Sequence, residues 1–172
     1  MRMAYWGMGR QWGKVMTPLK VVYARMPGSL KALLGILKFS DKGLTLDKGL
    51  QLLIGDLTAQ INGCSSCDDL GRAVAVRTGF DLRKLDAIRE YARSPLFTEK
   101  ERAALAYVEE ATQNKRVSDS TFENLRRYFD EREIVEITWL NAVQNYFNLI
   151  NLPLGIGSDG FCALERVKKT GH

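Results

Sequence analysis

The sequence predicts an all-α fold, a single-domain helical bundle of about seven or eight helices. Long segments carry apolar residues at helical spacing, no segment sustains the alternation of a strand, and no glycine-rich loop follows a strand-like run. The chain has 172 residues, of which 45% are hydrophobic and 26% are charged, and this suits one folded domain with a core of ordinary size. We expect an irregular lead-in over residues 1–15 and the helical domain over residues 16–172.

Prolines mark the starts of the first two helices. Thr17 can cap a helix in which Pro18 takes the first position, where its missing N–H costs nothing. This short helix should end near Met26. Pro27 can likewise start a second helix, which carries leucines on one face, at positions 30, 33, 34 and 37.

Two consecutive helices flank the first two cysteines. Apolar residues recur at helical spacing from Leu46 to Ile61, and Gly63 can close this helix because glycine readily adopts the left-handed conformation. The next helix should run from Cys64 to Thr78 and stop at Gly79. The sequence therefore predicts a C-x-x-C pair at a helix N-terminus.

Capping signals continue through the second half of the chain. Asp81 should start a helix that reaches about Arg93, the segment 98–101 (TEKE) has the form of a capping box, and a further helix should span Ser118 to Tyr128. The last predicted helix begins at Glu131 and is apolar on more than one face. Such a helix is central or lies at a subunit interface, so we expect a homo-oligomer.

Charge and composition exclude several classes of partner. The net charge is +5 and the isoelectric point is about 9.2, but adjacent basic pairs such as Arg126-Arg127 and Lys168-Lys169 are isolated, so we expect no nucleic-acid partner. No run of 18 apolar residues predicts a membrane span, and the first residues lack the apolar core of a signal peptide. With three cysteines, the expected location is the reducing cytoplasm.

The pair Cys64 and Cys67 is the main candidate for chemistry. A helix N-terminus favours thiolate over thiol, and the spacing allows one cysteine to resolve a mixed disulfide formed by the other. Carboxylates in the first turn, at Asp68 and Asp69, oppose the thiolate. Chain order alone does not decide which cysteine attacks, and two inert, small residues are the bland alternative.

Other site chemistry has weak support. A zinc site needs about four ligands, and only Cys162 and His172 remain, so we expect no metal and no cofactor. A Cys–His couple is not expected because the single histidine is the last residue. Asp56 lies two helical turns before Cys64 and can act as a proton relay; the alternative is a solvated aspartate on an amphipathic helix.

The thiol pair and its flanking segments resemble one known protein family. The stretch 62–67, NGCSSC, lies between an apolar helix and a helix that ends at Thr78-Gly79, and this is similar to the core of the AhpD-like, carboxymuconolactone decarboxylase superfamily. Three further segments fit the pattern of the family: Phe97–Ala106, Val117–Asp119 and Asn145–Asn148. The resemblance covers roughly residues 25–156, and the combination is more specific than C-x-x-C alone.

The resemblance implies an all-helical AhpD-like fold assembled as a trimer or hexamer. For the redox members of the family it also implies an antioxidant, peroxiredoxin-type activity that reduces hydroperoxides or exchanges disulfides. The implied partners are a small hydroperoxide and a protein disulfide or dithiol donor. By analogy, Cys67 is the attacking thiol. For Cys162 a spare core thiol is favoured over a third redox residue.

This sequence departs from the family at two positions. Redox members have a glutamate twelve residues before the first cysteine and a histidine four residues after the second, and here these positions hold Leu52 and Gly71. Such relay groups contribute on the order of 10²–10⁴ in rate. We therefore expect a thiol-dependent hydroperoxide or disulfide reductase with a degenerate relay; the alternative is a catalytically inactive member that serves as a structural or binding oligomer.

Overall fold

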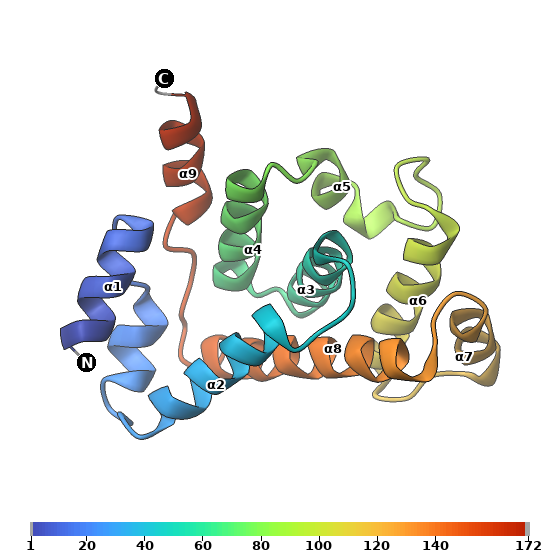
Figure 1. Cartoon of the computed structure of the whole chain (residues 1–172), viewed down its shortest axis with the longest axis horizontal. Helices are drawn as coiled ribbons and strands as arrows, with labels where there is room; N and C mark the ends of the chain where they lie inside the picture. Colours follow the sequence, from blue (N-terminus) through green and yellow to red (C-terminus); the bar gives the residue numbers. More distant parts are fainter. Residues whose placement is uncertain (1, 171–172) are drawn as a thin grey trace.

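The computed structural model describes residues 2–170, and all the regular structure in this range is helical (Figure 1). The predicted all-α class is confirmed. The α-helices are α1 (Arg2–Trp12), α2 (Ser29–Lys42), α3 (Lys48–Asn62), α4 (Ser65–Thr78), α5 (Leu82–Asp86), α6 (Glu99–Asn114), α7 (Asp119–Arg126), α8 (Glu131–Asn151) and α9 (Phe161–Thr170). A π-helical turn, Leu19–Tyr23, and a 3₁₀ turn, Ile88–Glu90, complete the set.

Helix α3 is the centre of the fold. It packs against α4, α6 and α8, which surround it in Figure 1. Its residues Leu53, Ile54 and Leu57 are fully buried in the main hydrophobic core. The helix begins at Asp47, whose side chain accepts the N–H of Leu50 at 3.1 Å. It ends at Gly63, in the left-handed conformation (φ +71°), as predicted.

Helix α4 follows α3 directly and also packs against α9. Cys64 is its N-cap and Gly79, again left-handed (φ +74°), its C-cap, so the predicted boundaries are confirmed. Ala73 and Ala75 are fully buried on this helix. Asp69 is also buried, and its carboxylate accepts the N–H groups of the first two residues of α9, each at 2.9 Å. The start of α9 is therefore fixed to α4.

Capping boxes begin two of the longest helices. The predicted box of α6 is present, with Thr98 and Glu101 satisfying each other's backbone N–H groups. Asp130 and Glu133 do the same for α8. Helix α8 runs along the bundle and contacts α3, α4, α6 and α7. It is thus a central helix, one of the two roles expected from its apolar faces.

The prediction of an irregular lead-in over residues 1–15 is wrong, because α1 spans Arg2–Trp12. Tertiary packing outweighs the glycine content of this segment. The ring of Trp12 packs edge-on against Phe161 of α9, with ring centroids 5.8 Å apart. The guanidinium of Arg77 from α4 lies 3.5 Å from the centroid of the same ring. The N-terminal and C-terminal helices therefore share one small core with α4.

Other boundaries also differ from the sequence prediction. The helix expected from Asp81 to Arg93 ends at Asp86, where the Leu85 carbonyl accepts from the guanidinium of Arg72 at 3.2 Å. Helix α9 was not predicted. No residue of α2 is buried, so its leucine face is only partly covered. No helix within residues 2–170 is both long and apolar enough to cross a membrane.

Candidate active site

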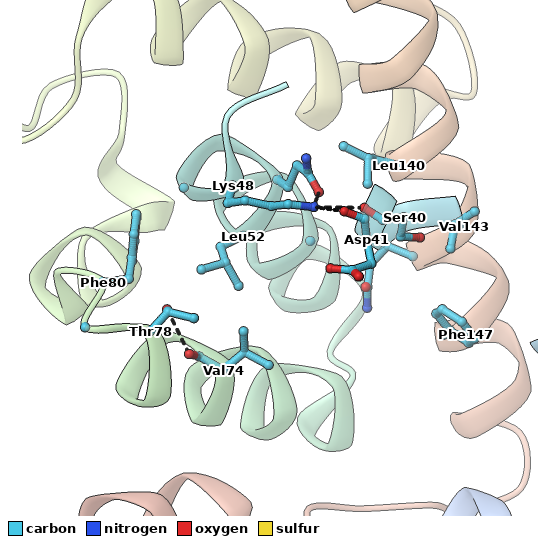
Figure 2. Close-up of a pocket in the computed structure, with 15 residues that line it drawn as sticks. Ser40, Asp41, Lys48, Leu52, Val74, Thr78, Phe80, Leu140, Val143 and Phe147 are labelled. Carbon is cyan, nitrogen blue, oxygen red and sulfur yellow. Dashed lines mark hydrogen bonds between the residues drawn. The ribbon is translucent and has the colours of Figure 1, made fainter. Parts of the chain in front are cut away.

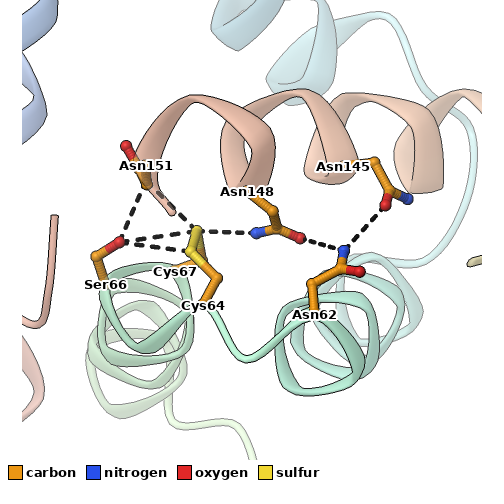
Figure 3. The surroundings of a disulfide bond; sticks show 7 residues. All are labelled: Asn62, Cys64, Ser66, Cys67, Asn145, Asn148 and Asn151. Carbon is orange, nitrogen blue, oxygen red and sulfur yellow. Dashed lines mark hydrogen bonds between the residues drawn. A yellow bond between two sulfur atoms is a disulfide. The ribbon is translucent and has the colours of Figure 1, made fainter. Parts of the chain in front are cut away.

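Cys64 and Cys67 form a disulfide at the start of α4, with Cα atoms 5.3 Å apart (Figure 3). Cys64 is the N-cap, and its carbonyl accepts the N–H groups of Cys67 at 3.1 Å and Asp68 at 3.0 Å. The first turn therefore brings the two sulfurs together at the positive end of the helix dipole. Cys64 is 2% exposed, whereas Cys67 is half-buried. Cys67 is consequently the more exposed of the two residues.

Two asparagines of α8 donate to the Cys67 sulfur. Nδ2 of Asn148 lies 2.9 Å from Sγ of Cys67, and Nδ2 of Asn151 lies 3.5 Å from the same atom (Figure 3). The Ser66 hydroxyl is 3.4 Å from the sulfur of Cys64 and 3.9 Å from that of Cys67. These donors favour the charged form of a thiol, so a thiolate formed on Cys67 would be stabilised.

A network of amides fixes the direction of the Asn148 side chain. Asn62, the last residue of α3, donates to Oδ1 of Asn148 at 2.8 Å and to Oδ1 of Asn145 at 2.9 Å. Since Oδ1 of Asn148 is occupied as an acceptor, its Nδ2 is directed at the sulfur. Asn145 in turn donates to the carbonyl of Asn141 at 2.9 Å.

Sequence reasoning did not single out these asparagines as site residues. The four asparagines of α8 occupy positions 141, 145, 148 and 151, and this spacing of four, three and three residues places them on one face of the helix. A polar stripe on an otherwise apolar helix is the signal that would have found them, because buried amides must be hydrogen-bonded.

Asp56 is buried rather than solvated, so the solvated alternative is wrong. It is 3% exposed and its Oδ2 accepts from Gln60 at 3.0 Å. Burial, together with the negative charge and side-chain hydrogen bond of Asp68, raises the pKa of its carboxyl to about 8, against smaller opposing effects of Arg72 and Gln60. Arg72 is itself held by Asp68, with Nε 3.0 Å from Oδ1.

The two positions at which the family relay is absent lie on α3 and α4. Leu52 lines a cavity of about 740 Å³ between α2, α3, α4 and α8 (Figure 2). Gly71 lies beside Asp56. The cavity walls are mostly apolar, with Val74, Leu140 and Phe147 around Leu52, and the volume is typical of small-molecule sites.

The remaining candidates do not join this site. Cys162 lies half-buried on α9 and forms no disulfide, and His172 lies outside the described residues. Within residues 2–170 no three His, Cys, Asp or Glu side chains gather as metal ligands would. The structure thus joins Cys64 and Cys67 at the start of α4. It buries Asp56 on the neighbouring helix α3, beside Gly71 of α4.

Comparisons with known proteins identify the family. No family model matches the sequence. The uncharacterized protein YnjA of Escherichia coli (strain K12) is 30% identical over 162 residues, which are 92% of this chain and 88% of YnjA. A crystal structure from Agrobacterium tumefaciens, of a protein proposed to be the antioxidant defence protein AhpD, is 28% identical and has a TM-score of 0.71 over 79% of this chain and 93% of that chain. The chain belongs to the AhpD-like, carboxymuconolactone decarboxylase superfamily.

A third comparison concerns the extent of the shared fold. The debrominase Bmp8 is 23% identical and has a TM-score of 0.81 over 96% of this chain and 89% of Bmp8. At this identity the similarity shows the fold alone. The family prediction made from the residues around the thiol pair is confirmed by the two preceding comparisons, and the fold shared with Bmp8 extends over nearly the whole chain.

Proposed function

We propose that this AhpD-like protein is a thiol-dependent reductase in which Cys64 and Cys67 cycle between dithiol and disulfide. The observation that carries this proposal is the disulfide itself, formed at a helix N-terminus with two amide donors on the Cys67 sulfur. Helix-terminal N–H groups and amide donors both lower the pKa of a thiol. The proposed substrate class is a small organic hydroperoxide, and the electron donor is an external dithiol.

The proposed reaction uses Cys67 as the attacking sulfur. Its thiolate attacks the outer oxygen of the hydroperoxide, the O–O bond breaks, and the products are a sulfenic acid on Cys67 and, after proton uptake, an alcohol. The Cys64 thiol then attacks the Cys67 sulfur, which forms the disulfide and releases water. An external dithiol reduces this disulfide through a mixed disulfide and is itself oxidised. Attack by Cys67 is supported by its greater exposure and by its amide donors.

We propose an organic rather than an inorganic hydroperoxide because a mostly apolar cavity lies close to the site along the chain, although neither cysteine lines it. It shares α3, α4 and α8 with the disulfide site, and Phe147 in its wall precedes Asn148, the residue that donates to Cys67. The alkyl or aryl group of an organic hydroperoxide, bound in this cavity, would shield the apolar side chains of its walls from water. The alternative, an inactive binding oligomer, is not favoured, since the cysteine pair and its donors are intact.

Turnover of tert-butyl hydroperoxide with dithiothreitol as the donor tests this proposal. We expect the Cys67→Ser variant to lose hydroperoxide-dependent turnover. We expect the Cys64→Ser variant, treated with the hydroperoxide in the absence of dithiothreitol, to stop after one attack, with a sulfenic acid that dimedone traps. The matched control is Cys162→Ser, which removes a cysteine outside the site and should turn over like the unmodified protein. Equal turnover in the Cys67→Ser and Cys162→Ser variants would reject the proposal.

A further inference from the structure

Gly71 leaves room for a Cβ atom on the face of α4 that carries the Cys67 side chain. Residue 71 follows Cys67 by four positions, so the two share a helix face one turn apart. A Cβ atom built on Gly71 would have only one non-neighbouring heavy atom within 4 Å, which is Oδ1 of Asp56 at 4.0 Å. Asp56 therefore directs one carboxyl oxygen at the space directly below Cys67.

That oxygen has no hydrogen-bond donor among residues 2–170, although Asp56 is 97% buried. Oδ1 is the one buried side-chain oxygen or nitrogen in the described chain without a partner. An ionised carboxylate oxygen without a donor is costly to bury, so the structure favours a carboxyl that keeps its proton. A protonated Asp56 can donate to the neighbouring Asp68, which gives the two carboxyl groups one shared proton.

Arg72 of α4 is a cation that acts on Asp56, but it forms ion pairs with two other carboxylates. Its Nε lies 3.0 Å from Asp68, and its Nη1 lies 2.6 Å from Asp86 of α5. Gln60 of α3 donates to Oδ2 of Asp56. Asp68 itself follows Cys64 by four positions, which places it one turn below that cysteine. Each cysteine therefore has one member of the carboxyl pair on its side of the helix.

We infer that the Asp56–Asp68 carboxyl pair holds the proton that the Cys64–Cys67 couple exchanges in each redox step, with the space at Gly71 as the route between Asp56 and Cys67. This inference rests on the proposed function. During reduction, the donor dithiol breaks the S–S bond and supplies two electrons, and the sulfur that leaves takes the proton of the carboxyl pair. The proton released by the oxidised donor then restores the pair. During oxidation, the Cys67 thiol gives its proton to the pair as its sulfur attacks, and the pair passes a proton to the alkoxide that leaves, so that the pair again holds one proton.

Single-turnover reduction of the disulfide by dithiothreitol tests the inference without a hydroperoxide. The rate is measured between pH 5.5 and 10 and divided by the fraction of donor thiolate. For the unmodified protein we expect the corrected rate to be high while the pair is protonated and to fall as the pH rises through about 8. The Asp56→Asn variant should lack this fall and should reduce at least about tenfold more slowly at pH 6.5.

Two further variants make the test specific. Asp68→Asn removes the like charge next to Asp56 at a partly exposed position, so the fall in rate should move to lower pH. Asp69→Asn is the matched control, because this neighbouring buried carboxylate is occupied by N–H groups of α9 and should leave the profile unchanged.

The outcomes separate the inference from the proposed function. An Asp68→Asn profile identical to that of the unmodified protein overturns the inference, even where Asp56→Asn fails to fold. Absence of hydroperoxide turnover overturns the proposed function and is measured in a different assay. A pH-dependent reduction rate that responds to Asp56 and Asp68 but not to Asp69 supports the carboxyl pair.

Discussion

Asn148 of α8 places its Nδ2 atom 2.9 Å from Sγ of Cys67 on α4, and this contact connects the candidate site to the centre of the bundle. Asn148 is fully buried, and its own acceptor oxygen is held by Asn62 at the end of α3. Helices α3, α4 and α8 are therefore linked through the Cys67 sulfur and the Asn148 side chain. The position of that sulfur depends on packing over much of the chain, whereas its acidity depends on a few local donors.

Loss of the Asn148 donor should make Cys67 a weaker acid. A hydrogen bond to a charged group contributes about 1.5–3 kcal/mol, of which a part acts only on the thiolate. We expect Asn148→Ala to raise the pKa of the reduced Cys67 thiol by about one unit, and Asn148→Asp to raise it further by adding a negative charge. The measurement is the pH dependence of iodoacetamide alkylation, followed at Cys67 by peptide mass spectrometry.

Asn145→Ala is the matched control for this prediction. Asn145 lies one turn earlier on α8 and contacts Asn62 and the Asn141 carbonyl, but not a sulfur. Its removal should leave the alkylation profile of Cys67 within a few tenths of a pH unit. A profile that shifts equally in the alanine variants of Asn145 and Asn148 would contradict a specific role for the Asn148 donor.

Burial of Asp56 should make the fold less stable as the pH rises. Burial and the nearby Asp68 raise the folded-state pKa of Asp56 to about 8, whereas its unfolded value is about 4. The stability that this carboxyl contributes is therefore complete below about pH 4 and is lost as the pH rises through 8. Asp56→Asn should unfold at higher urea concentration than the unmodified protein at pH 9, by a free energy on the order of a few kcal/mol, and the difference should shrink on acidification and vanish below about pH 4.

Asp69 should show the opposite dependence. Burial alone would raise its pKa, but the N–H groups of Cys162 and Phe161 outweigh burial and lower the pKa below its ordinary value. Its contribution to stability is present above the ordinary pKa and is lost on acidification. Asp69→Asn should therefore be destabilising at pH 7, by about 1–3 kcal/mol, with a smaller effect below pH 3. Parallel pH dependences for the two aspartate variants would contradict these assignments.

The parts of the fold that the sequence predicts are those encoded within a few residues. The cap at Cys64, the left-handed glycines at 63 and 79 and the capping box from Thr98 to Glu101 each satisfy backbone groups within one turn. Because the thiol pair lies between two such signals, its position at a helix start followed directly from the residues around it.

The features that sequence reasoning missed depend on partners far along the chain. Helix α1 is stabilised by Phe161 and Arg77, and no local pattern in its glycine-rich sequence indicates them. Asp56 occupies a position where an amphipathic helix commonly exposes a carboxylate, and its burial follows from the approach of α4. The asparagines of α8 acquire a role only because α3 and α4 end and begin opposite them.

An exposed apolar stripe on α8 predicts self-association. Val135, Tyr146 and Leu149 are exposed on one face, Leu149 with 69% of its surface. Contiguous exposed apolar residues commonly mark association sites. We expect light scattering at micromolar concentration to report a homo-oligomer, a trimer or hexamer, and Leu149→Glu to lower the mass. Phe122→Glu, at an exposed position on α7, is the control; a monomeric unmodified protein would contradict the prediction.

The open space at Gly71 predicts that a relay can be added to this site. A side chain at residue 71 would extend from the face of α4 shared with Cys67 and would meet Oδ1 of Asp56 first, at 4.0 Å from its Cβ. In Gly71→His, an imidazole would therefore have a carboxyl partner to orient it and a sulfur within reach to deprotonate. General-base assistance contributes on the order of 10²–10⁴ in rate, so we expect hydroperoxide turnover at pH 7 to rise by at least about tenfold.

Gly71→Gln fills the same space without a titrating group and separates base catalysis from a steric effect. We expect it to turn over no faster than the unmodified protein, because an amide cannot take up the thiol proton. The gain in Gly71→His should also disappear below about pH 5.5, where the imidazole is protonated, and should be lost in a double variant with Cys67→Ser. A rise of equal size in the glutamine variant, or a histidine variant whose gain is independent of pH, would show that the side chain acts by packing rather than as a proton acceptor.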